Sequence, residues 1–72
     1  MAKTQTDCEN ILKTGASLTL NCIGRTGSEL ESLASIAAKA GGMLTITNAE
    51  MFTMSILSNI ANQGKSHVHF VF

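Results

Sequence analysis

The chain has 72 residues, of which 44% are hydrophobic, and its five basic residues balance its five acidic ones. This length allows one domain near the lower size limit for a self-sufficient core, and the apolar content argues against wholesale disorder. Zero net charge disfavours nucleic-acid binding, because phosphate contacts need a basic excess, and it removes the self-repulsion that keeps small proteins apart.

The first 15 residues predict a partial helix and no targeting segment. Cys8, Ile11 and Leu12 recur at helical spacing, and Gly15 follows them. The N-terminus lacks the apolar core of a signal peptide, and no apolar run approaches the roughly 20 residues that span a bilayer. We therefore expect a cytoplasmic protein with no membrane contact, in which Cys8 and Cys22 are buried free thiols.

Residues 16–42 predict a strand followed by a capped helix. The strand has apolar residues at every second position, namely Leu18, Leu20 and Cys22. Thr26, with Glu29 three residues later, predicts the start of the helix, because the two side chains can cap each other's backbone N–H groups. Gly41 and Gly42 mark its end, where a left-handed residue is favoured.

Residues 43–66 repeat this unit, and residues 67–72 add a terminal strand. Leu44 and Ile46 alternate with threonines, and a second helix is predicted from the Thr53 cap to Gly64. The terminal strand has apolar residues at Val68, Phe70 and Phe72. Counted back from the strands, the two units superpose at a separation of 24 positions, from Leu44 to Val68.

These elements predict a single α/β domain, a short right-handed open (α)βαβαβ unit. Strands that alternate with helices run parallel, and right-handed crossovers that all step the same way place the helices on one face. The opposite face of the sheet should stay open and polar, because its residues are not a continuous hydrophobic run. Its predicted residues include Thr19, Asn21, Thr45, Thr47, His67 and His69.

The strand sequences carry a resemblance to a known repeat family. Leu18-Thr19-Leu20-Asn21 and Leu44-Thr45-Ile46-Thr47-Asn48 resemble the L-x-L part of the leucine-rich repeat. The ladder asparagine of that family would stand at Ile23 and Ala49, so the resemblance concerns architecture only. It implies strands along one wall, helices packed outside, and a protein-interaction surface rather than an active site.

The two histidines, His67 and His69, are two residues apart on the predicted terminal strand. Both rings would project from the same side and could supply two ligands to zinc or copper. A metal site needs a third and a fourth ligand, and the neighbouring strand offers no carboxylate in phase. We therefore expect solvent-facing or interface histidines and no metal cofactor.

A candidate anion site lies at the start of the first full helix, at Arg25, Thr26, Gly27 and Ser28. Free N–H groups at a helix N-terminus can hold a phosphate or a carboxylate, although a plain capped helix explains the same residues. No serine, threonine or cysteine stands at a recognisable spacing from a catalytic base. We therefore expect neither enzyme activity nor a cofactor.

The terminal strand is the candidate interface: Val68, His69, Phe70, Val71 and Phe72. No helix is predicted after it, and about three stacked repeats are normally needed to close such a core. We therefore expect a structural or interaction module that self-associates or is capped by a protein partner. Self-association could give a closed dimer, or a ring or filament. We favour the closed dimer because the N-terminal helix should shield the edge of the first strand. Alternative functions are a small-ligand or anion binder that uses the helix N-termini and open strand face, and an inhibitor or immunity-type protein.

Overall fold

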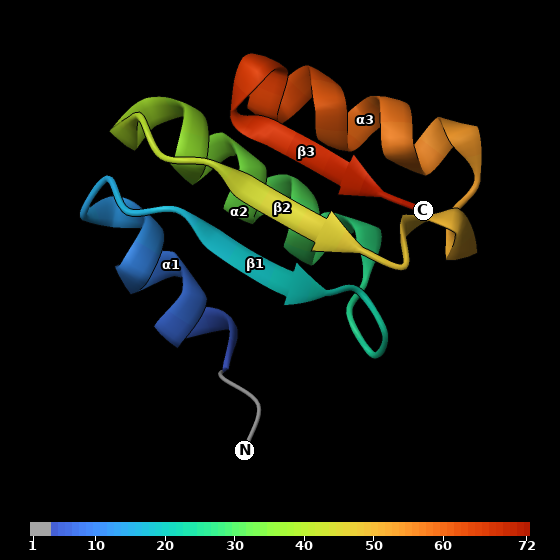
Figure 1. The fold of residues 1–72 in the computed structure, drawn as a ribbon, viewed down its shortest axis with the longest axis horizontal. Coiled ribbons are helices and arrows are strands. Elements are labelled where there is room, and N and C mark those ends of the chain that lie inside the picture. Colours follow the sequence, from blue (N-terminus) through green and yellow to red (C-terminus); the bar gives the residue numbers. More distant parts are fainter. Residues whose placement is uncertain (1–3) are drawn as a thin grey trace.

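The computed structural model describes residues 4–72 and confirms the predicted α/β fold. Its helices are α1 (Gln5–Lys13), α2 (Gly27–Ala40) and α3 (Met54–Gly64), and its strands are β1 (Leu18–Asn21), β2 (Leu44–Thr47) and β3 (Val68–Val71). The 3₁₀ turns η1 (Ala49–Met51) and η2 (Lys65–His67) precede α3 and β3. The strands lie parallel in the order β1-β2-β3 (Figure 1). Within residues 4–72, no helix is long and apolar enough to cross a membrane.

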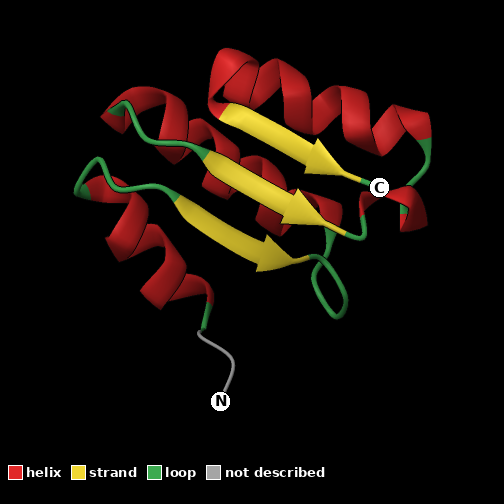
Figure 2. Ribbon diagram, viewed as in Figure 1, coloured by secondary structure: helices red, strands yellow, loops and turns green. Residues whose placement is uncertain are grey.

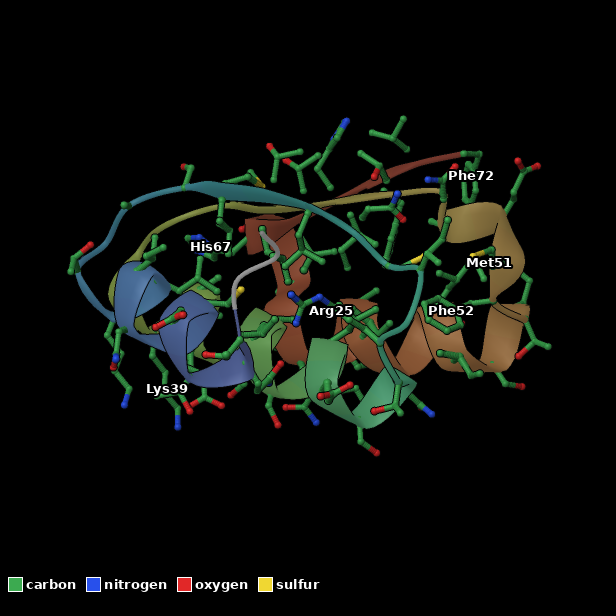
Figure 3. The ribbon with its side chains drawn as sticks, turned by 90° about the horizontal axis from the view of Figure 1, so that it is seen from below. Arg25, Lys39, Met51, Phe52, His67 and Phe72 are labelled. Atoms are coloured by element: carbon green, nitrogen blue, oxygen red, sulfur yellow. The ribbon has the colours of Figure 1, made fainter. Side chains whose placement is uncertain are left out.

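The molecule has two layers, because all three helices pack on the same face of the sheet. Figure 2 shows the helices behind the strands. Figure 3, which is turned by 90° and seen from below, draws the strands above the helices. The shortest extent of the molecule is 18 Å, which suits one sheet and one layer of helices. The other face of the sheet has no covering element among the described residues, as the polar alternation predicted.

The core lies between the sheet and the helices. Two rows of apolar side chains cross the sheet toward the helices, Leu18–Leu44–Val68 and Leu20–Ile46–Phe70. The middle member of each row, Leu44 or Ile46, is 0% exposed. The remaining buried core residues come from the helices and loops: Cys8, Leu12, Cys22, Leu30, Leu33, Ala34, Ala37, Ala49, Leu57 and Ile60. Both cysteines are therefore buried, and both thiols are free.

Threonines begin all three described helices. The Thr26 hydroxyl accepts from the Glu29 N–H and the Glu29 carboxylate accepts from the Thr26 N–H, which confirms the predicted capping box, and Thr53 caps α3. Thr4 and Asp7 form a second capping box at the start of α1. The predicted N-terminal helix thus has a start signal of its own, which the sequence analysis did not identify.

The two helix ends differ in how they use glycine. Gly41 has φ 86° and ends α2 in the left-handed conformation, as predicted. Gly64 ends α3, as predicted, but its φ is −91°, and the residue with positive φ is Lys65, at φ 53°. Gly64 is required for space instead, because a Cβ there would lie 2.5 Å from Val68 Cγ2 and 3.0 Å from Ala34 Cβ.

Candidate interaction surface

The outer edge of β3 is the first part of the candidate surface. Within residues 4–72, β3 has a sheet neighbour on one side only, which is β2. Leu18 N–H donates to Met43 O, and Cys22 N–H donates to Thr47 O. The backbone N–H and C=O groups of alternate β2 residues therefore point toward β1. The backbone groups of the intervening β2 residues point toward β3. By the same alternation, the N–H and C=O groups of Val68 and Phe70 point outward, away from β2. An edge of this kind can pair with another chain.

Exposure along β3 matches this edge position. Val68 and Phe70 point toward the core yet are only half-buried, whereas His69 and Val71 are exposed. Phe72 follows the strand and is 72% exposed, so it does not continue the apolar alternation into the core. The structure thus brings all five predicted interface residues to one free edge.

A group of exposed apolar side chains extends this edge. Five large apolar residues in the described part of the chain are exposed: Ile23 at 61%, Met51 at 58%, Met54 at 73%, Val71 at 40% and Phe72 at 72%. Val71 is the last residue of β3 and the other four come after the carboxyl end of a strand. Because parallel strands end at the same side of the sheet, we call the five residues the carboxyl-end cluster. Figure 3 shows Phe72 and Met51 at this end, with the half-buried Phe52 below them. Large apolar side chains that remain exposed at one end of a sheet indicate a candidate interaction surface.

Sequence reasoning found only two members of the carboxyl-end cluster, Val71 and Phe72. Ile23, Met51 and Met54 lie in loops or at a helix start, where neither strand nor helix periodicity identifies them. The one signal in the sequence was position: Ile23 and Met51 are large apolar residues two and four residues beyond a strand end, and Met54 directly follows the Thr53 helix cap.

Among residues 4–72, the outer edge of β1 also has no neighbouring strand. A groove of about 470 Å³ runs along this strand, lined by Leu18, Thr19, Leu20, Asn21, Ile23, Cys8 and Arg25. Helix α1 packs mainly on α2, in the helical layer, and reaches the groove through Cys8. The expectation that the N-terminal helix shields this edge is therefore wrong.

The open sheet face holds the predicted polar residues in two rows. Thr19, Thr45 and His69 form one row, and Asn21, Thr47 and Val71 form the next. Two of these side chains satisfy the protein's own backbone: the Thr47 hydroxyl donates to Leu20 O at 3.4 Å, and Asn21 Oδ1 accepts from the Ile23 N–H at 2.9 Å. Fewer polar groups therefore remain for a ligand than the sequence pattern suggested.

His67 does not join this face in the predicted way. It belongs to η2, one residue before β3 begins, and it is half-buried. Its Nδ1 lies 2.8 Å from the Gly42 carbonyl oxygen, and Figure 3 shows the side chain on the helix side of the strands. The prediction that His67 and His69 project together from one strand is therefore wrong. Among residues 4–72, no three His, Cys, Asp or Glu side chains lie close enough to hold a metal ion.

The candidate anion site already contains a carboxylate of the protein. Glu29 Oε1 lies 2.9 Å from the Thr26 nitrogen and 3.3 Å from its hydroxyl oxygen. Ser28 lines a depression of about 590 Å³ together with Glu9 and Glu31, so further negative charge lies nearby. Arg25 is half-buried, and its Nη2 lies 3.8 Å from Cys8 Sγ. These contacts favour a capped helix and disfavour a bound anion.

Thr26→Ala should lower the free energy of unfolding by about 1 kcal/mol, the usual loss when an N-cap acceptor is removed. Urea unfolding of both proteins measures this difference.

Arg25→Ala tests the anion site separately: phosphate should change the melting temperature of this variant and of the wild type equally. A stabilisation by phosphate that Arg25→Ala abolishes would support an anion-binding function instead.

No family model, no curated protein and no solved structure matches this chain. Two features of residues 4–72 bear on function: the carboxyl-end cluster and the unpaired edges of β1 and β3.

Proposed function

We propose that the protein is a non-enzymatic structural or interaction module, which a second copy or a protein partner completes through the edge of β3. The observation that carries this proposal is the carboxyl-end cluster, which continues the free edge of β3 through Val71 and Phe72. A free edge supplies backbone hydrogen bonds, and the cluster supplies apolar area, the two contributions that strand addition uses. The proposed architecture is that of a leucine-rich-repeat-like solenoid fragment.

The free energy gained by burying Val71 and Phe72 can be compared with the cost of association. Full burial of one large apolar side chain stabilises by about 1.5–3 kcal/mol, so Val71 and Phe72 together supply at most about 6 kcal/mol. Association costs roughly 4–15 kcal/mol in lost translational and rotational freedom. The two residues therefore offset only the lower part of this cost, and we expect the contact to include the strand edge and further members of the carboxyl-end cluster.

Val71→Lys and deletion of Phe72 should each lower the mass of the protein in solution toward the 7.6 kDa of one chain. Val71 is exposed and points away from the core, so its replacement should leave the folded content unchanged. Sedimentation velocity gives the mass, and far-UV circular dichroism gives the folded content.

Ser32→Lys is the matched control, because it adds the same charge at an exposed position on the middle helix α2, away from both strand edges. This variant should keep the wild-type mass. The proposal is wrong if Val71→Lys and the Phe72 deletion keep the wild-type mass, or if Ser32→Lys lowers it equally.

A further inference from the structure

We infer that the partner at β3 is a second copy added head to tail, with β3 of one copy paired in parallel with β1 of the next. This inference rests on the proposed function, and it assigns the groove along β1 as the receiving site. Four observations carry it: the internal repeat, the exposure of the edge residues, the direction of the free backbone groups, and the open groove.

The chain already contains this contact twice. Its elements form three successive helix–strand units, α1–β1, α2–β2 and α3–β3. Each strand pairs in parallel with the next, Leu18 with Leu44 and Leu44 with Val68, and each helix packs on the next one. The α1–β1 unit of a second copy can follow α3–β3 by the same step, because it has the same order of elements and its own capped helix.

Exposure in the two core rows shows what each edge lacks. Leu44 and Ile46, which have a strand on both sides, are 0% exposed. Their row neighbours on β1 and β3 are only half-buried: Leu18, Leu20, Val68 and Phe70. Joining β3 to β1 of the next copy would give all four the second neighbour that buries the middle of each row.

The free backbone groups of the two edges are compatible. On β1, Leu18 and Cys22 bond toward β2, so the N–H and C=O groups of Thr19 and Asn21 point outward. On β3, the outward groups belong to Val68 and Phe70. Parallel pairing therefore sets Thr19 beside His69, which is the row position that Thr45 has inside the molecule. This register directs every apolar side chain of the added strand toward the helices.

The groove and the adjacent helix suit such an addition. The groove of about 470 Å³ runs along the whole of β1 and ends at Ile23, a member of the carboxyl-end cluster. In the inferred register, Ile23 lies just beyond Phe72 of the neighbouring copy. Helix α3, which would receive the next α1, contains no charged residue from Met54 to Gly64, so covering it desolvates no ion.

A closed dimer explains fewer of these features. A two-fold axis would pair β3 with β3 in antiparallel orientation and would satisfy that edge once. The groove along β1 would remain empty, and Leu18 and Leu20 would remain half-exposed. The head-to-tail contact uses both edges and can continue from copy to copy.

Two variants, each blocked at one edge, test the inference by mixing. Thr19→Pro removes an outward N–H from β1 and leaves β3 intact, since proline is tolerated on edge strands. Val71→Lys with Phe72 deleted blocks β3 and leaves β1 intact. Each variant alone should have the mass of one chain, and an equimolar mixture should double that mass, because the intact β3 of one variant fits the intact β1 of the other.

The outcomes separate this inference from the proposed function. One outcome is that Thr19→Pro keeps the wild-type mass, that the β3 variant is a single chain, and that mixing does not raise the mass. In that case β3 pairs with itself, so the head-to-tail contact is wrong and the proposed function stands. If neither variant differs in mass from the wild type, both are wrong. Should circular dichroism show that Thr19→Pro is unfolded, Thr19→Lys replaces it, because a lysine also blunts an edge strand.

Discussion

Ile46→Asp is expected to abolish folding. Ile46 is 0% exposed in the middle strand, and the described residues include no buried polar or charged residue that could pair with a carboxylate. A buried unpaired charge costs several kcal/mol, whereas a core below about 70–80 residues rarely supplies more than about 3–5 kcal/mol of stability. Circular dichroism should show neither native signal nor a cooperative thermal transition.

Thr45→Asp is the matched control for this change. Thr45 precedes Ile46 on the same strand, points to the opposite face and is half-buried. We expect a folded protein that has lost about 1 kcal/mol, because aspartate has low strand propensity but its charge can reach water. Equal loss of folding in both variants would show that both faces of the sheet are covered, contrary to the two-layer fold.

Gly42→Ala should be the second most damaging single change. Gly42 is buried, and a Cβ at this position would clash with the backbone carbonyl oxygen of Ala16, with a further contact of 3.2 Å to Gly15 O. Backbone atoms cannot move aside as a flexible side chain can, so the strand-entry loops on either side must shift. We expect a loss of about 3 kcal/mol or more in urea unfolding, at the upper end for overpacking.

Gly24→Ala is the control for backbone strain without a clash. Gly24 has φ 83°, and no neighbouring atom lies within 4 Å of the position that a Cβ would take. Its replacement should cost about 1 kcal/mol, the penalty for an L-residue in the left-handed region. If Gly24→Ala destabilises as strongly as Gly42→Ala, close packing at Gly42 is not the cause.

The sequence predicted the elements and the sheet because both follow from local periodicity. Alternation in Leu18-Thr19-Leu20 and Leu44-Thr45-Ile46 identified the strands and their core-facing side, and the pairing of Leu44 with Val68 follows the separation of 24 found in the sequence. Thr26 and Thr53 identified two helix starts, since capping depends on residues within one turn.

The candidate surface was predicted only in part, because it depends on contacts between distant segments. Ile23, Met51 and Met54 come to the same end of the sheet as the β3 terminus only because the three strands run parallel. His67 was misplaced because its ring bonds to Gly42, 25 residues away. Whether α1 shields the edge of β1 depended on helix packing, on which strand periodicity has no bearing.

The mass of the wild-type protein over a wide concentration range tests the central claim most directly. Multi-angle light scattering should give a mass above the 7.6 kDa of one chain, rising with concentration past two chains as copies add head to tail. A plateau at two chains would contradict the head-to-tail contact alone. A mass of one chain at every concentration would contradict the claim that the edge of β3 is completed by another copy.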